Sequence, residues 1–96
     1  MSKIRKSARG EDCTARIPGV CNFDPETTIL AHISGVRYGS GKGKKVSDLI
    51  SLYACSACHD VIDRRTKTDH DRDFVEKCML EGHLETLMKL EKKGLV

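Results

Sequence analysis

Four of the five cysteines are placed to bind one metal ion. Cys55 and Cys58 enclose two residues, the spacing at which two thiolates reach one tetrahedral ion. Cys13 and Cys21 enclose seven residues, and a Pro-Gly turn between them can bring the two thiols together. Because four thiolates fill a tetrahedral shell, we expect a closed structural Zn²⁺ site that contributes to folding rather than to chemistry.

Other chemistries of these cysteines fit less well. Cys55 to His59 also matches the C-x-x-C-H pattern of covalent haem attachment. That attachment normally takes place outside the cytosol, and it would leave Cys13 and Cys21 unexplained, so we expect no haem. No βαβ pattern surrounds the pair, which disfavours a thioredoxin-like redox site. The fifth cysteine, Cys78, lies on the apolar face of a predicted helix and is expected to be a buried core thiol.

Two histidines and a carboxylate form a second candidate site. His32 ends a predicted strand, just before a glycine-rich loop. His59 and Asp63 are four residues apart on a predicted helix, so their side chains point the same way. Together they could hold one divalent ion and leave positions open for water and phosphate. An ordinary surface pair on the helix explains the same spacing, and the pair alone does not decide between the two.

Length and composition favour a metal-stapled intracellular protein. The chain has 96 residues, of which 39% are hydrophobic, with no Trp. A core this small usually needs a disulfide, a metal or oligomerisation. The first residues form no apolar signal and no stretch is long enough to span a membrane, which predicts a cytoplasmic protein with no membrane partner. Thiols stay reduced there, so a metal is the expected staple.

Positive charge is concentrated in the first half of the chain. Residues 1–45 carry nine Lys or Arg against four Asp or Glu, whereas residues 46–96 carry eight against ten. The glycine-rich segment 34–47 contains four cations and no acid, so it predicts a surface that faces a polyanion. The expected phosphate contacts are Arg37, Lys42, Lys44 and Lys45, with Arg64 and Arg65 from the end of the following helix.

Sequence patterns predict an α+β fold over one domain, residues 1–96. The final helix has acids in its first turn and lysines in its last, as the helix dipole prefers, and Gly82 predicts a bend in its middle. Its apolar positions are Phe74, Cys78, Leu80, Leu84, Leu87 and Met88. The expected order is a basic arm (1–12) with a short helical turn broken at Gly10, a cysteine knuckle (13–21), strands at 25–33 and 49–54, a helix from 56, and a C-terminal packing helix within 69–94, at 71–93.

A knuckle, a hairpin and a helix with a C-x-x-C pair describe a treble-clef zinc finger, here residues 13–65. With the histidines, the chain resembles the HNH (His-Me finger, ββα-metal) nucleases. It resembles most the YbcO-like group of phage and prophage proteins, regarded as nucleases. The resemblance spans residues 5–65, and the motifs that carry it are Ala8-Arg9-Gly10, residues 16–22, Pro25-Glu26-Thr27, Leu30-Ala31-His32-Ile33 and residues 54–65.

The resemblance implies a metal-dependent endonuclease that hydrolyses DNA. His32 would be the general base, while His59 and Asp63 would hold the catalytic divalent ion, Mg²⁺ or another. Many relatives have a further metal ligand where this chain has Ala31, and the middle Asn of the motif has its nearest polar counterparts in Asp48 and Ser51. The alternative is a treble-clef module that binds DNA or a protein partner without cutting. Small HNH proteins often act as dimers or with a partner, so the resemblance also allows a homodimer.

Overall fold

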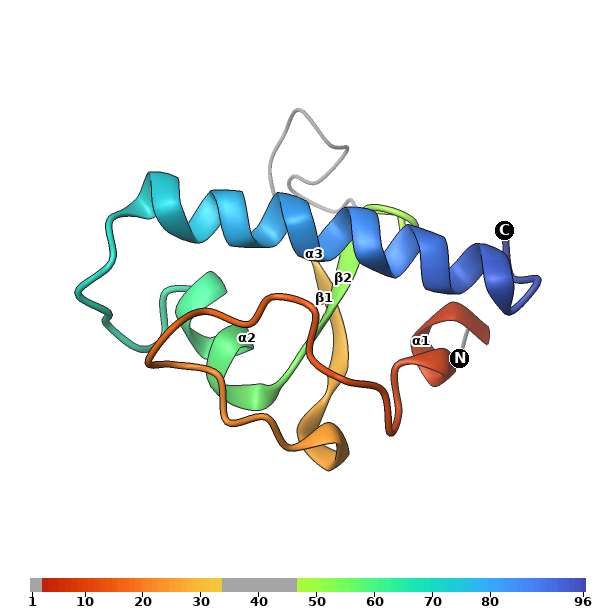
Figure 1. The fold of residues 1–96 in the computed structure, drawn as a ribbon, viewed down its shortest axis with the longest axis horizontal. Helices are drawn as coiled ribbons and strands as arrows, with labels where there is room; N and C mark the ends of the chain where they lie inside the picture. Colours follow the sequence, from red (N-terminus) through yellow and green to blue (C-terminus); the bar gives the residue numbers. More distant parts are fainter. Residues whose placement is uncertain (1–2, 34–46) are drawn as a thin grey trace.

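The computed structural model describes residues 3–33 and 47–96. Four cations expected to contact phosphate, Arg37, Lys42, Lys44 and Lys45, therefore lie outside the described residues. The described elements confirm the α+β class, with a two-stranded sheet and three α-helices (Figure 1). In chain order they are α1 (Lys3–Ser7), the 3-10 turn η1 (Pro25–Thr27), β1 (Ile29–His32), β2 (Ser51–Ala54), α2 (Ser56–Ile62) and α3 (Arg72–Lys92).

The predicted hairpin is present, with a shorter first strand. β1 pairs antiparallel with β2, from Ile29 opposite Ala54 to His32 opposite Ser51. The prediction that this strand begins at residue 25 was wrong, because η1 occupies that segment. Asp24 caps η1 by accepting a hydrogen bond from the Glu26 amide at 3.1 Å, and the proline that follows Asp24 suits a helical first position.

The outer edge of β2 is satisfied by a helix and a loop in place of a third strand. The Tyr53 carbonyl accepts a hydrogen bond from the Thr14 amide at 2.8 Å, and the Tyr53 amide donates to Thr86 Oγ1 at 3.0 Å. His83 Nδ1 donates to the Ser51 carbonyl at 2.7 Å. Buried backbone groups need partners, so these contacts fix α3 and the knuckle against the sheet.

Those contacts also decide which face of α3 is buried. The prediction that Leu80, Leu84 and Met88 belong to the core was wrong: they are 57%, 52% and 67% exposed. The helix turns the side that carries Gly82 and Thr86 toward β2, and Leu84 lies on the opposite side of the helix. The residues of α3 that are buried are Val75, Cys78, Met79, Gly82, Thr86 and Leu90, which confirms Cys78 as a buried thiol.

Gly82 lies where α3 crosses β2 most closely. A Cβ atom built at Gly82 would lie 2.8 Å from Leu52 Cδ1 and 2.9 Å from Thr14 Oγ1. A side chain is therefore excluded by the sheet and the knuckle. α3 continues through Gly82 as one helix from Arg72 to Lys92, so the glycine permits close packing where we expected a bend (Figure 1).

The basic arm packs against the far end of α3. Its short helix α1 ends before Gly10, which has a φ of 79°, as expected for a residue that breaks the turn. Tyr53 and Leu90 form the centre of an apolar cluster with Ala8 of the arm, and the Tyr53 hydroxyl hydrogen-bonds Ser7 Oγ at 2.6 Å. The larger cluster lies between the knuckle, the hairpin, α2 and the first half of α3. None of the helices described is long and apolar enough to cross a membrane.

Candidate functional site

The four predicted cysteines converge. Cys13 and Cys21 come from the knuckle, Cys55 precedes α2 and Cys58 lies in its first turn. Their sulfur atoms all lie within 4.8 Å of one another, with Cys21 and Cys55 Sγ 3.8 Å apart. Within residues 3–33 and 47–96, these four cysteines are the one group of three or more side chains placed to hold a metal ion. The donor set and its burial suit one metal with no open position.

Hydrogen bonds and burial within the cluster shift the pKa values of its thiols in opposite directions. A hydrogen bond from the Cys58 thiol lowers the pKa of Cys13 to about 4, with help from the backbone amides of Arg16 and Cys55. The same hydrogen bond raises the pKa of Cys58, and burial raises that of Cys21 to about 11. The Cys58 amide also approaches Cys55 Sγ at 3.4 Å. A bound cation would displace the remaining thiol protons and would stabilise the thiolate charges together with the backbone amides.

Local turns and one ion pair hold the knuckle in place. The amides of Val20 and Cys21 both donate to the Ile17 carbonyl at 3.0 Å, and Ile17 is fully buried. Arg16 has a φ of 44°, a left-handed conformation that costs a non-glycine residue free energy. Its guanidinium makes two hydrogen bonds of 2.7 Å to the Glu85 carboxylate on α3. This paired contact holds the knuckle against the helix and keeps the pKa of Glu85 below its usual value.

His32 is held by Asp48 at the end of the hairpin. His32 Nε2 lies 2.7 Å from Asp48 Oδ1, and Arg5 Nε lies 3.2 Å from the same oxygen. Ser51, opposite His32 on β2, donates to the Asp48 carbonyl at 2.6 Å. A carboxylate can only accept, so Nε2 carries the proton, and Nδ1, which has no hydrogen bond to a described residue, can act as a base. Of the two expected polar counterparts, Asp48 contacts His32 and Ser51 supports Asp48.

The other two predicted residues lie near His32. His59 Nε2 and Asp63 Oδ2 are 3.0 Å apart on α2, and Arg65 Nη2 lies 3.5 Å from the same Asp63 oxygen. His32, His59 and Asp63 line one depression of about 400 Å³. The pair offers one imidazole and one carboxylate, which fits a divalent ion with several open positions.

Ala31 contributes nothing polar to this depression. It is fully buried and packs in the larger apolar cluster against the hairpin and α2. The alternation of a strand places it on the face opposite Leu30 and His32. The position at which the resemblance to HNH nucleases predicts a further ligand is therefore part of the core in this chain.

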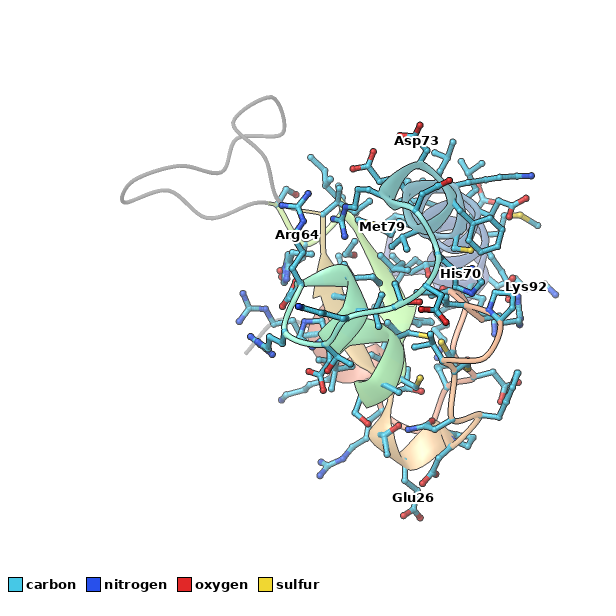
Figure 2. All side chains as sticks on the ribbon, turned by 90° about the vertical axis from the view of Figure 1, so that its left-hand side faces the viewer. Glu26, Arg64, His70, Asp73, Met79 and Lys92 are labelled. Atoms are coloured by element: carbon cyan, nitrogen blue, oxygen red, sulfur yellow. The ribbon has the colours of Figure 1, made fainter. Side chains whose placement is uncertain are left out.

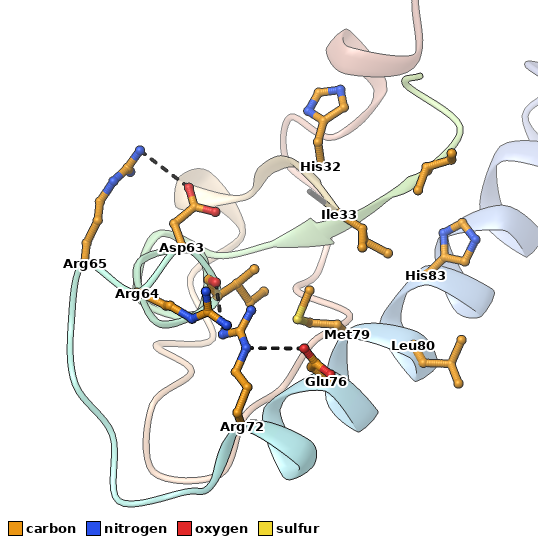
Figure 3. A pocket seen from close by; sticks show the side chains of 12 residues that line it. His32, Ile33, Asp63, Arg64, Arg65, Arg72, Glu76, Met79, Leu80 and His83 are labelled. Atoms are coloured by element: carbon orange, nitrogen blue, oxygen red, sulfur yellow. Dashed lines mark hydrogen bonds and ion pairs between the residues drawn. The ribbon is translucent and has the colours of Figure 1, made fainter. Parts of the chain in front are cut away.

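A larger cleft of about 770 Å³ adjoins this depression and shares His32 and Asp63 with it (Figure 3). Arg64 and Arg65 line it, as do two residues that sequence reasoning missed, Arg72 and His83. Arg72 Nη1 donates to the Ile62 carbonyl at 3.1 Å, at the end of α2. Both missed residues contact segments far away in the sequence, so spacing along the chain could not indicate them.

Arg64 has a strained backbone at the rim of this cleft. It follows the last residues of α2 and has a φ of 62°, where a glycine would be more usual. Its side chain points into the region lined by Arg72 and Met79 (Figure 3). Strain of this kind often accompanies a functional side chain, because the backbone sets its direction.

Comparison with known proteins assigns the family. The family model described as "Putative nuclease YbcO" matches residues 2–95. The chain belongs to the YbcO family. It is 49% identical over 98 residues to "Putative nuclease YbcO" of Escherichia coli (strain K12), covering all of this chain and 98% of that protein. The same identity and coverage hold for the protein of that name from Enterobacteria phage 82.

A solved structure supports the fold of this YbcO-family chain. It is described as "Structure of a putative bacteriophage protein from Escherichia coli str. K-12 substr. MG1655" and is 48% identical in sequence. The two structures superpose with a TM-score of 0.80 over 96% of this chain and all of that one. The predicted resemblance to the YbcO group is therefore confirmed, and it extends beyond residues 5–65 into α3.

If the four clustered cysteines hold a metal ion, replacing one of them should release the ion, whereas replacing Cys78 should not. We expect Cys55→Ser to lose bound metal and to lower the melting temperature strongly, because Cys55 would be a metal ligand and its sulfur also caps α2. Cys78→Ser is the matched control, since Cys78 is equally buried but lies outside the cluster. Metal analysis of the purified chains checks this. Equal metal content in both variants would exclude the cluster as the binding site.

Proposed function

We propose that this YbcO-family chain is a metal-dependent endonuclease of the HNH type that hydrolyses phosphodiester bonds in DNA. The observation that carries the proposal is the shared depression lined by His32, His59 and Asp63, a base and a pair of metal-ligating side chains. The relatives named as nucleases, one of them from a phage, agree with this chemistry and with a phage or prophage origin.

Zn²⁺ is the metal proposed for the four cysteines. Thiolates select soft or borderline cations, and a four-thiolate tetrahedral site is typical of structural zinc. The knuckle, the hairpin and α2 then form a treble-clef finger around the ion. This site has no open ligand position, so the catalytic groups must lie elsewhere.

In the proposed reaction His32 takes a proton from the attacking water. Asp48 accepts the hydrogen bond from Nε2, which keeps Nδ1 available and stabilises the imidazolium that forms. The water then attacks the phosphorus atom in line with the leaving oxygen. Asp48 thus acts as a positioning residue, and Arg5 holds its carboxylate from the other side.

His59 and Asp63 are proposed to hold a divalent ion, with Mg²⁺ as the first candidate. When bound, the ion would supply Lewis acidity at the phosphate and charge neutralisation at the leaving oxygen. His59 Nε2 and Asp63 Oδ2 are 3.0 Å apart, so their ligand atoms are already adjacent. Because Asp63 also pairs with Arg65, that arginine is free to turn toward phosphate once the carboxylate is engaged.

Arginines at the rim are proposed to position the nucleic acid backbone. Arg64, Arg65 and Arg72 line the larger cleft, and Arg72 lies beside Arg64 (Figure 3). Contacts of this kind give affinity that falls with salt and carry no sequence information. The loop cations Arg37, Lys42, Lys44 and Lys45 are proposed to add to this surface.

One observation favours a second candidate function. Ala31 is buried at the position of a ligand in many HNH nucleases, so the ion would have two protein ligands here. A site with fewer ligands binds the ion less tightly. The chain would then be a treble-clef module that binds DNA, or a protein partner, without cutting it.

His32→Ala tests the proposed base. We expect it to lower the cleavage rate by roughly 10²–10⁴-fold, because the proton acceptor is lost. Asp48→Asn should give a smaller loss, since the amide can still accept from Nε2 but carries no charge. The assay measures cleavage of plasmid, single-stranded and branched DNA with Mg²⁺ or Mn²⁺.

His70→Ala is the control for this experiment. His70 contacts Pro18 and Phe74 on the other side of the molecule, so its removal should leave the rate unchanged (Figure 2). Equal cleavage by wild type and His32→Ala would refute the assignment of the base. Salt-sensitive binding with no cleavage by wild type would favour the non-catalytic module.

Arg64→Gly tests the phosphate contact without loss of the fold. Glycine adopts a φ of 62° without strain, so we expect unfolding free energy to stay equal or rise by up to about 1 kcal/mol. DNA affinity should fall, and the slope of its salt dependence should decrease by about 1. Arg16→Ala, which removes a cation paired with Glu85, should leave that slope unchanged. An unaltered slope in Arg64→Gly would contradict the contact.

A further inference from the structure

α3 presents an apolar stripe to solvent. Leu80, Leu84 and Met88 follow each other at intervals of four residues, and each is more than half exposed. Figure 2 looks nearly along α3 and shows Met79 on the side that faces the sheet and Asp73 on the side away from it. The stripe shares the Asp73 side. In a chain this poor in large apolar residues, three of them aligned on one exposed face indicate an interface.

Two opposite charges lie at equal distances from Leu84, one toward each end of α3. Lys77 precedes Leu84 by seven residues and Glu91 follows it by seven. Seven residues are two helical turns, so both charges lie on the same face as the stripe, about 10 Å from Leu84. In the part of the chain that the structure describes, neither Lys77 nor Glu91 forms an ion pair, and both residues are exposed.

We propose that two copies of this chain pair through α3, antiparallel, about a two-fold axis beside Leu84. Leu84 of one copy then meets Leu84 of the other, and Leu80 lies level with Met88. Lys77 of each copy lies level with Glu91 of the other, so the symmetry forms this charge pair twice. A parallel pairing would place Lys77 against Lys77 and Glu91 against Glu91, and is disfavoured.

The charge pattern indicates that the partner of this apolar stripe is a second copy of the chain. A rotation about Leu84 exchanges Lys77 with Glu91, so this charge pair is complementary to itself, as a two-fold interface requires. Leu80 also lines the larger cleft, so the second copy would border the route by which nucleic acid reaches His32.

Sedimentation equilibrium over a range of protein concentrations tests the interface. We expect wild type to approach twice the chain mass as concentration rises. Leu84→Glu places two carboxylates at the axis and should remain monomeric, with an unchanged melting temperature because the position is exposed. Leu49→Glu is the matched control, since Leu49 is an exposed leucine outside α3, and it should associate as wild type does. A wild type that stays monomeric, or a Leu84→Glu chain that dimerises, would overturn the proposal.

A charge exchange tests the antiparallel register. Lys77→Glu alone, or Glu91→Lys alone, replaces two attractions by two repulsions and should weaken self-association by roughly tenfold. The double variant Lys77→Glu, Glu91→Lys restores opposite charges across the axis and should associate as wild type does. A double variant that associates no more tightly than the two single ones would exclude this register. Neither measurement depends on nuclease activity.

Discussion

Convergence of four thiols is the constraint on which the remaining structure depends. Cys13 and Cys21 lie at the two ends of the knuckle, and Cys55 and Cys58 lie where β2 passes into α2. The knuckle in turn provides the Thr14 amide to the edge of β2 and the Arg16 guanidinium to α3. A two-stranded sheet is marginal in water by itself. A metal held between these segments would give this hairpin the support that its small core cannot supply.

Helix α2 contributes residues both to the cysteine cluster and to the depression beside His32. Cys58 points into the cluster and is fully buried, whereas the next residue, His59, lines the depression with Asp63. A rigid cluster therefore fixes the direction of His59 relative to the hairpin that carries His32. Asp48 and Arg5 complete the arrangement from the loop before β2 and from α1. Positioning by packed elements on three sides is what a general base requires.

Local signals in the sequence predicted the parts that depend on neighbouring residues. The C-x-x-C pair, the hairpin, the start of α3 near Asp71 and the i, i+4 pair of His59 and Asp63 follow from spacing and propensity. The exposed face of α3 did not, because its rotation is decided by two hydrogen bonds, one from His83 to the Ser51 carbonyl and one from the Tyr53 amide to Thr86. Arg72 and the role of Gly82 were missed for the same reason: each depends on a contact between distant segments.

Titration of the reduced, metal-free wild-type chain with Zn²⁺ tests the central claim most directly. Circular dichroism would follow the helix signal, which α3 dominates, and the near-ultraviolet signal of the buried Tyr53 would report packing of the sheet. The account predicts that both signals rise together and saturate at one ion per chain, because the cluster joins the knuckle to the end of β2 and to α2, and α3 packs on β2. Full helix and tyrosine signals before any metal is added would contradict it.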